Sequence, residues 1–239
     1  MALPKVLVCA PTSIYKDYCF KEWIENVMNF TYPNFDIFLC DNSPSIDYSI
    51  SINKYVSERY GKLFFPYHYP LSPLTLVERI AFSHDMCRHI LLSKGYDYML
   101  HLETDVFPQA DIIERLLWNN KEICGAVYYT DEGANRKPVL QRIVELSDNK
   151  EDIVSLNFEP TEDLGFMDGE VKQVGHVGLG CILIKKEVFA NIEFRCDLNL
   201  PEYSADSFFA NDCYDQNIPI FADTSLVVKH NNRKWIDLQ

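Results

Sequence analysis

The chain has no apolar run that approaches the length needed to span a bilayer, and it has no Cys-x-x-Cys pair. Basic residues are also few: 22 Lys and Arg stand against 35 Asp and Glu, giving a formal net charge of −13. A field of this sign argues against a protein that coats nucleic acid or an anionic membrane. We therefore expect no nucleic-acid partner and no integral membrane segment. A local basic pocket remains compatible with this charge.

Eight cysteines are scattered along the sequence, without the clustering that a zinc site needs. Cys9, Cys40, Cys124 and Cys181 lie inside apolar runs, where cysteine behaves as a small hydrophobic residue. The first residues lead directly into an apolar run, without a signal-peptide pattern. These features predict reduced thiols and a cytoplasmic protein, with peripheral membrane contact left open.

Of the 239 residues, 47% are hydrophobic, which is enough for one substantial core. In the first half, short apolar runs alternate with segments of helical periodicity, the pattern of a parallel sheet flanked by helices. We expect strands at residues 5–10, 35–40, 62–67, 96–100 and 123–128, and helices at residues 17–30, 74–93 and around 112–117.

From residue 130 the pattern changes. We expect a hairpin of residues 139–144 and 153–158, an acidic surface loop at 159–170, a strand at 181–184, a short helix at 186–191, a helix at 206–216 and short strands at 220–221 and 225–228. No repeat or linker interrupts the chain. The sequence therefore predicts one α/β domain over residues 1–239, with two unequal halves that meet near residue 130.

Two carboxylates, Glu103 and Asp105, follow the apolar run of residues 96–100, just before Pro108. In an extended backbone residues i and i+2 point to the same side, so both acids are expected to reach one space while Thr104 faces away. Ligands of open α/β sheets bind at the carboxyl ends of the strands. Paired carboxylates there suit a hard divalent cation, and that cation suits a diphosphate. A solvated strand end is the alternative for so short a motif.

The order of the segments KVLVCAPTS, FDIFLCDNSP, DYMLHLETDVFP, VGHVGLGCILIKKEVF, SADSFFANDCYDQN and VVKH resembles the GT-A-fold nucleotide-sugar glycosyltransferases, in particular the large family 2-like group. The resemblance runs from about residue 5 to residue 230 and is weakest at residues 130–170. It implies a single GT-A (Rossmann-like) domain with a mostly parallel central sheet, flanking helices and a smaller mixed β part in the second half. The first half, residues 1–129, would then bind the nucleotide, and residues 130–239 would bind the acceptor.

The resemblance implies a nucleoside site after the first two strands. Pro11 and Thr12 fall where such enzymes bring backbone groups to the nucleoside, and Asp41 matches an acid that contacts the base or ribose. An acid there favours uridine slightly over guanosine, although Asp-Asn-Ser-Pro would form an Asx-turn regardless. Arg79, His84 and Arg88 lie on the helix before the carboxylates, and Arg79 is the one expected to reach the diphosphate.

A metal site is implied by the match of Glu103 and Asp105 to the D-x-D element, which holds Mn²⁺ or Mg²⁺ against the donor's two phosphates. Thr104 belongs to the same donor-binding segment. Because Glu replaces the first Asp, Asp105 is the stronger candidate ligand. His230 matches a histidine that completes the metal shell or contacts the diphosphate, although a lone histidine after a strand can also be a surface residue. Imidazole beside carboxylates favours Mn²⁺ somewhat. Arg233 and Lys234 follow it, either as groups that close over the diphosphate or as an ordinary polar tail.

The resemblance also implies a general base, Asp206, at the start of the predicted helix 206–216. Family members commonly carry Glu-Asp there, whereas this chain has Ala205-Asp206. The alternative is an acid that simply stabilises a helix N-terminus. His176, Gly178 and Gly180 precede the strand at 181–184 and would line the sugar or acceptor pocket. Their G-x-x-G-x-G order opens a strand, so it is not a dinucleotide fingerprint.

Together these matches predict a metal-dependent glycosyltransferase that moves a sugar from a nucleoside diphosphate to a hydroxyl of a glycan or glycoconjugate, with inversion and Asp206 as base. A retaining mechanism stays open. A sugar nucleotidyltransferase is a second hypothesis, but the Gly-rich basic loop usual after its first strand is missing at residues 10–14. A third is a catalytically silent carbohydrate-binding protein on the same fold.

Overall fold

The carboxyl ends of four parallel strands meet on one side of the central sheet. They belong to β1 (Val6–Thr12), β2 (Phe35–Asp41), β3 (Tyr67–His68) and β4 (Tyr98–Leu102), and they lie in the order β3-β2-β1-β4. The computed structural model describes residues 3–61, 66–69, 74–129, 137–143, 158–160, 164–200 and 203–231. The expected strand at 62–67 is seen only as β3, because residues 62–65 lie outside the described ranges.

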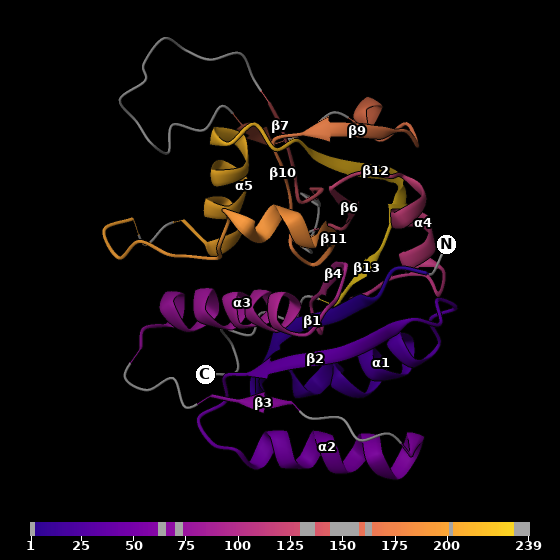
Figure 1. Cartoon of the computed structure of the whole chain (residues 1–239), viewed down its shortest axis with the longest axis vertical. Coiled ribbons are helices and arrows are strands. Elements are labelled where there is room, and N and C mark those ends of the chain that lie inside the picture. The colour runs from indigo at the N-terminus through magenta and orange to yellow at the C-terminus, as the bar shows by residue number, and fades with distance from the viewer. Residues whose placement is uncertain are drawn as a thin grey trace.

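The second half of the sequence completes the same sheet (Figure 1). The order continues from β4 through β11 (Cys181–Lys185), β6 (Ile123–Val127), β12 (Ile220–Val227) and β9 (Val171–Val174). β6 and β12 pair in parallel, whereas β11 and β9 run antiparallel to their neighbours. The sheet is therefore large and mainly parallel, which confirms the predicted fold class.

Helices cover both faces of the sheet. β1 alternates between them, with Val6, Val8 and Ala10 in one core cluster and Leu7 and Cys9 in the other. The first face packs against α1 (Asp17–Met28), α2 (Asp47–Tyr60) and α4 (Ile112–Trp118), and the second against α3 (Leu76–Ser93), the 3₁₀ helix η4 (Lys186–Ala190) and α5 (Ala205–Asp215) (Figure 1). The predicted helices are confirmed, and α2 was not predicted.

α3 has the clearest local sequence signals. Thr75 accepts a hydrogen bond from the backbone N–H of Glu78, and the Glu78 side chain accepts one from the backbone N–H of Thr75, a capping box that starts the helix. Gly95 follows its end at φ 72°, a conformation that favours glycine. The residues of α3 that are buried include two polar ones, Ser83 and His84, together with Ala81, Cys87 and Leu91.

Small sheets complete the structure. β7 (Leu140–Ile143) pairs antiparallel with β8 (Phe158–Pro160) and with β10 (His176–Val177). β8 overlaps the expected hairpin partner, residues 153–158, only at Phe158, because residues 144–157, including the expected turn, lie outside the described residues. The strands expected at 220–221 and 225–228 form the single strand β12, with an irregular register between Asp223 and Val227. β5 (Val106–Phe107) pairs with β13 (Lys229–His230).

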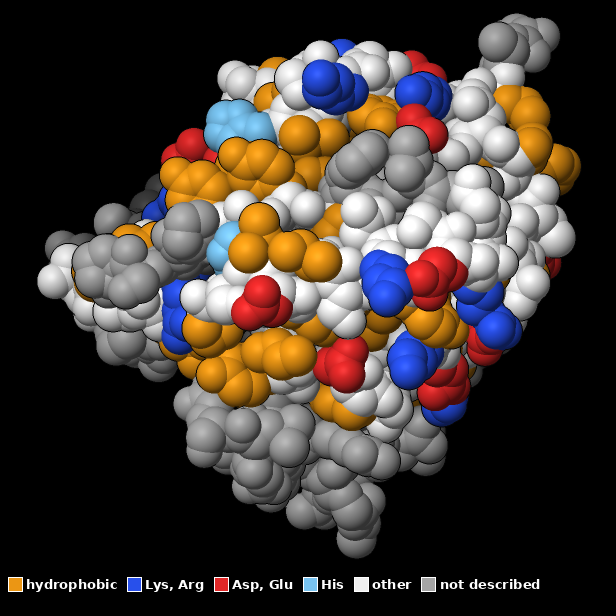
Figure 2. Space-filling view, turned by 90° about the horizontal axis from the view of Figure 1, so that it is seen from below, with side chains coloured by type: hydrophobic (Ala, Val, Ile, Leu, Met, Phe, Trp, Pro, Cys, Tyr) orange, Lys and Arg blue, Asp and Glu red, His pale blue; other side chains and the backbone are white. Residues whose placement is uncertain are grey.

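The surface carries mixed charge. Figure 2 shows the face that includes α2, where acidic and basic side chains lie next to one another and hydrophobic side chains reach the surface between them. Lys54 pairs with Glu58 on α2, and Arg59 pairs with Glu25.

All eight cysteines are free, and seven of them are buried. Over the described ranges, no helix combines the length and the apolar character that a bilayer crossing requires.

Candidate functional site

A pocket of about 260 Å³ opens where β1, β2 and β4 end. Four of the predicted donor-binding residues line it: Pro11, Thr12, Glu103 and Thr104. The other lining residues are Ser13, Tyr15, Lys16, Asn42, Ile80 and His84. A larger cavity, of about 430 Å³, lies between β9 and the end of α5, and no predicted site residue is among its lining residues. The pocket of about 260 Å³ at the strand ends is therefore the candidate site.

The two acids do not reach this pocket through an extended backbone. The N–H of Val106 donates to the carbonyl of Glu103 at 3.0 Å, so residues 103–106 form a turn after β4. The expected i, i+2 geometry is therefore wrong, because the strand ends at Leu102. Thr104, expected to face away, lines the pocket and is buried, and its Oγ1 has no hydrogen-bond partner. The turn nevertheless brings both carboxylates into one space.

Lys16 joins that space from the 3₁₀ helix η1 (Ile14–Lys16), which follows β1. Its ammonium group donates a hydrogen bond to Oδ2 of Asp105. Burial by itself lowers the pKa of Lys16, but the charges of Glu103 and Asp105 more than offset this and raise it. Sequence reasoning missed Lys16, although a lysine in the turn after a first strand is a recognisable signal for an anion site.

A candidate metal centre is formed by Glu103, Asp105 and His230, whose ligand atoms all lie within 4.8 Å of one another. β13 carries His230 to the acids because it pairs with β5, and the N–H of Asn231 donates to the carbonyl of Asp105 at 2.8 Å. Nδ1 of His230 donates to the carbonyl of Tyr129 at 3.2 Å, which leaves Nε2 as the ligand atom.

The chemistry of these groups fits a divalent cation. Oδ1 of Asp105 is buried without a hydrogen-bond partner, so the site holds an unused acceptor atom. Burial opposes ionisation of Asp105, yet contacts with His230 and Lys16 lower its pKa. Burial raises the pKa of Glu103 and the nearby Asp105 charge adds to this, while Asp105 raises the pKa of His230 against the effect of burial. Of Glu103 and Asp105, Asp105 is thus the acid that stays ionised more readily, and its role as a metal ligand stays a prediction.

Tyr128 packs beneath this centre and explains two of the predicted pocket glycines. Its ring lies edge-on to His230, with 5.0 Å between centroids, and its hydroxyl accepts a hydrogen bond from the N–H of Gly180 at 3.3 Å. A Cβ on Gly180 would lie 2.5 Å from Cε1 of Tyr128, and one on Gly178 would overlap the Tyr128 hydroxyl. Glycine is therefore required here by packing, and a contact of either residue with sugar stays a prediction.

Asp206 lies in the first turn of α5, where its Oδ2 is 3.4 Å from Nε2 of His176. Its Oδ1 accepts hydrogen bonds from the Ser204 hydroxyl and from the N–H of Ser207. Burial opposes ionisation, but His176 and Ser204 together lower the pKa of Asp206 well below its usual range. The charge of Asp206 makes a small further contribution to the raised pKa of Glu103.

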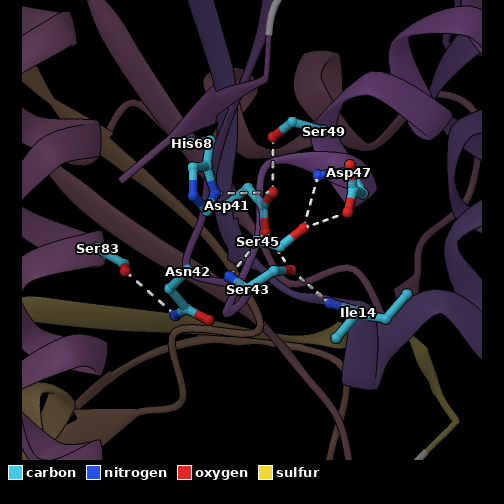
Figure 3. A network of polar contacts seen from close by, with 9 residues as sticks. All are labelled: Ile14, Asp41, Asn42, Ser43, Ser45, Asp47, Ser49, His68 and Ser83. Carbon is cyan, nitrogen blue, oxygen red and sulfur yellow. Dashed lines mark hydrogen bonds and ion pairs between the residues drawn. The ribbon is translucent and has the colours of Figure 1, made fainter. Parts of the chain in front are cut away.

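Asp41 is enclosed by its own neighbours (Figure 3). It is 0% exposed, and it accepts hydrogen bonds from the backbone and hydroxyl of Ser43 and from the hydroxyl of Ser49 at 2.6 Å. Nδ1 of His68 lies 3.4 Å from its Oδ2. Asp41 therefore shapes the turn after β2, and the neighbouring Asn42 is the residue that lines the pocket.

Two further expectations concern cations. Arg79 lies on α3 but is not among the pocket-lining residues, and its Nε is buried without a hydrogen-bond partner. Its contact with a diphosphate stays a prediction. Arg233 and Lys234 lie outside the described residues.

No protein-family model and no curated protein matches the sequence. Three solved structures give the following likenesses. GalNAc-T7 with UDP, GalNAc and Mn²⁺ has a TM-score of 0.65 at 11% identity, over 97% of this chain and 44% of its own. S. aureus TarS 1-349 with UDP-GlcNAc has a TM-score of 0.56 at 10% identity, over 97% and 60%. A197 from STIV has a TM-score of 0.49 at 16% identity, over 96% and 86%.

The chain thus spans about half the length of the GalNAc-T7 and TarS chains that it matches. Identities this low establish the fold alone. The expected family 2-like membership stays a prediction, because no family model supports it. What the likenesses do establish is that the chain has the mixed α/β fold of the GT-A glycosyltransferases.

Proposed function

We propose that this chain is a metal-dependent glycosyltransferase that moves a sugar from a nucleoside diphosphate to a hydroxyl of a glycan or glycoconjugate, with inversion at the sugar. The observation that carries the proposal is the convergence of Glu103, Asp105 and His230 beside the pocket at the strand ends. Two structures of the same fold were solved with UDP and a sugar or with a UDP-sugar, and one of them also with Mn²⁺. A nucleotide-sugar donor is the ligand that suits both observations.

The metal would be held by Asp105, His230 and Glu103. Mn²⁺ or Mg²⁺ would offset the charge that develops on the departing diphosphate. Lys16 donates a hydrogen bond to Asp105, and with a metal bound to that carboxylate its ammonium would be available to the phosphates. The hydrogen bond from His230 to Tyr129 keeps the imidazole oriented with Nε2 toward the acids.

The nucleoside would lie against Pro11, Thr12 and Asn42, with Asp41 holding the turn beneath it. The Ser83 hydroxyl donates to the carbonyl of Arg79 at 2.7 Å, so it accepts from Nδ2 of Asn42 at 3.2 Å. The amide oxygen of Asn42 is then left as an acceptor on the pocket wall (Figure 3). An acceptor there suits a base that presents an N–H, such as uracil or guanine. Uridine remains the slightly favoured nucleoside.

Transfer needs a carboxylate that takes the proton of the acceptor hydroxyl as the new C–O bond forms. Asp206 fits this role: its Oδ1 accepts hydrogen bonds from Ser204 and Ser207, while its Oδ2 lies a long 3.4 Å from Nε2 of His176. Proton transfer to Oδ2 would leave His176 to hold the carboxylate in place.

Within one domain, residues 1–129 would bind the nucleotide and residues 130–239 would bind the acceptor. The eight free thiols suit a reducing, cytoplasmic setting.

The test is a thermal-shift screen of UDP, GDP, CDP and their sugars, with and without Mn²⁺, on the natural chain and on Asp105→Asn. We expect a Mn²⁺-dependent stabilisation by one nucleotide and its sugar, lost in Asp105→Asn. Asp223→Asn is the matched control, because Asp223 is equally buried but contacts Asn119 and Ser225 instead. An unchanged shift in Asp105→Asn would contradict the metal assignment.

Turnover separates this proposal from the alternatives. Release of the nucleoside diphosphate from the donor, with Mn²⁺, is expected of a transferase, even when water is the acceptor. A response to nucleoside triphosphate with sugar phosphate would favour a nucleotidyltransferase instead. Donor binding without any release over hours would favour a silent carbohydrate-binding protein.

A further inference from the structure

Two buried imidazoles lie against each other between α3 and β4, and the proposed reaction does not use them. His101 on β4 is 0% exposed, and His84 on α3 is 5% exposed. Nδ1 of His84 lies 2.8 Å from Nε2 of His101, and their ring centroids are 4.7 Å apart. Phe194 packs against both rings, with 5.4 Å between its centroid and that of His84. Burying a polar nitrogen without a hydrogen-bond partner costs free energy, so each ring nitrogen needs a partner group.

The hydrogen-bond chain sets which nitrogen of each ring carries a proton. Nδ1 of His101 lies 2.6 Å from the carbonyl of Leu179, and a carbonyl only accepts, so this nitrogen carries hydrogen. A charged ring is costly at this depth, so both imidazoles are neutral. Nε2 of His101 is therefore bare and accepts the hydrogen of Nδ1 of His84. It follows that Nε2 of His84 is bare as well.

That bare nitrogen belongs to a side chain that lines the candidate site. His84 lies on the pocket wall with Glu103 and Thr104. In the part of the chain that the structure describes, its only hydrogen bond runs to His101. The pair also leads toward the proposed base, because His101 is bonded to Leu179, in the segment that carries His176, and His176 lies 3.4 Å from Asp206. The pocket wall therefore offers Nε2 of His84 as an acceptor, and a ligand group that binds it must be a donor.

We propose that His84 determines donor specificity, because its Nε2 accepts a hydrogen bond from one hydroxyl of the transferred sugar. This inference rests on the proposed function. His101 is a positioning residue in this scheme: it holds the tautomer of His84 and ties it to the backbone of Leu179. The substrate class is then a donor whose sugar keeps that hydroxyl free, and the site discriminates against a sugar that lacks it or carries it as an ether.

The test uses binding of UDP, of the nucleotide sugar that binds best, and of its monodeoxy analogues, all with Mn²⁺. A net hydrogen bond between neutral groups corresponds to about 3- to 10-fold in affinity. The natural chain should therefore bind one monodeoxy donor about 3- to 10-fold more weakly than the parent donor. In His84→Phe the parent donor should weaken to that level, while UDP and the deoxy donor should bind unchanged. His89→Phe is the control, since His89 is exposed on the same helix and pairs with Asp85.

The outcomes are separable. If the natural chain binds no nucleotide sugar, the proposed function fails and this inference falls with it. If it binds one and His84→Phe shows the same preferences among deoxy donors, this inference alone is overturned. Should His84→Phe fail to fold, nitrogen NMR of the natural chain reads the tautomer directly. A bare Nε2 on His84 that responds to the nucleotide sugar but not to UDP supports the proposal, and a protonated Nε2 or an equal response to UDP overturns it.

Discussion

Lys16 donates a hydrogen bond to Asp105 across 89 positions of sequence, so the strongest candidate metal ligand carries a cation of the chain's own. Only 2% of the Asp105 side chain is exposed, which makes an unpaired charge there costly. The lysine side chain is 24% exposed, so it reaches the surface beside the buried acid. Lys16 and a divalent cation are then competitors for one carboxylate.

This competition predicts the effect of Lys16→Met. In the absence of nucleotide, the variant should bind Mn²⁺ about tenfold more tightly or better, because no ammonium has to be displaced. Calorimetric titration of Mn²⁺ measures this, and Lys21→Met, on α1 with its ammonium over the Tyr55 ring, is the control. With Mn²⁺ saturating, the same variant should bind the nucleotide sugar more weakly, because it has lost a phosphate cation. Unchanged Mn²⁺ affinity would show that the two cations do not compete.

The position of Asn42 on the pocket wall leads to a prediction about which nucleobases the site binds. The Asn42 amide oxygen can pair with the N–H of uracil, whereas cytosine presents an acceptor at the same ring position. Asn42→Ala should reduce the preference for UDP over CDP by about 3- to 10-fold. Competition binding of the two nucleotides measures the ratio. Asn29→Ala, at the exposed end of α1, should leave it unchanged, and an unaltered ratio in Asn42→Ala would move base recognition to other residues.

The position of Glu103 and Asp105 could be predicted because the segments that place them, a strand and a turn, are adjacent to them in the sequence. The apolar run before them can only form a buried strand, and the turn signals after them fix where the strand ends. Parallel sheets collect their strand ends at one edge, which is why Pro11, Thr12, Glu103 and Thr104 line one pocket. His230 could be expected there only from the family resemblance, because its place depends on the pairing of β13 with β5.

The groups that sequence reasoning missed depend on contacts between distant segments. Lys16 reaches Asp105 through a 3₁₀ turn, which has no periodic pattern. His101 lies inside an apolar strand on the same face as Met99, so its burial can be inferred from the sequence. Its contact with His84 on α3 cannot, because the two residues lie on different elements. α2 buries only one residue per turn on most of its length, at Tyr48, Ile52 and Val56, which is too narrow a stripe to recognise.

Asp206→Asn tests the proposed base. Transfer should fall by about 10²- to 10⁴-fold, because amide cannot accept the proton, while donor affinity stays within about twofold. The control is Asp215→Asn, an exposed acid at the other end of α5. Rates come from steady-state release of nucleoside diphosphate with the acceptor present, and donor affinity comes from calorimetry. Near-normal transfer in Asp206→Asn would rule this residue out as base.

The lowered pKa of Asp206 makes a prediction about stability that is independent of turnover. Its folded pKa lies below the value of about 3.9 that an aspartate has in an unfolded chain. The free energy that its ionised form contributes is therefore complete above about pH 5 and is lost as pH falls through the folded pKa. Asp206→Asn should lower the free energy of unfolding by about 1–2 kcal/mol, equally at pH 7 and pH 6, because hydrogen bonds to a charged group are lost.

At pH 3 the difference between the two chains should be smaller, because the Asp206 carboxyl of the unfolded natural chain gains a proton there while that of the folded chain stays ionised, which favours unfolding. Urea unfolding at the three pH values measures each difference, and Asp215→Asn should show no such pH dependence. A difference that grows toward acid would mean that the folded structure raises the pKa of Asp206. The carboxylate would then be held ready to take a proton in the free protein. A difference that shrinks means that His176 and Ser204 hold the carboxylate ionised in the folded chain.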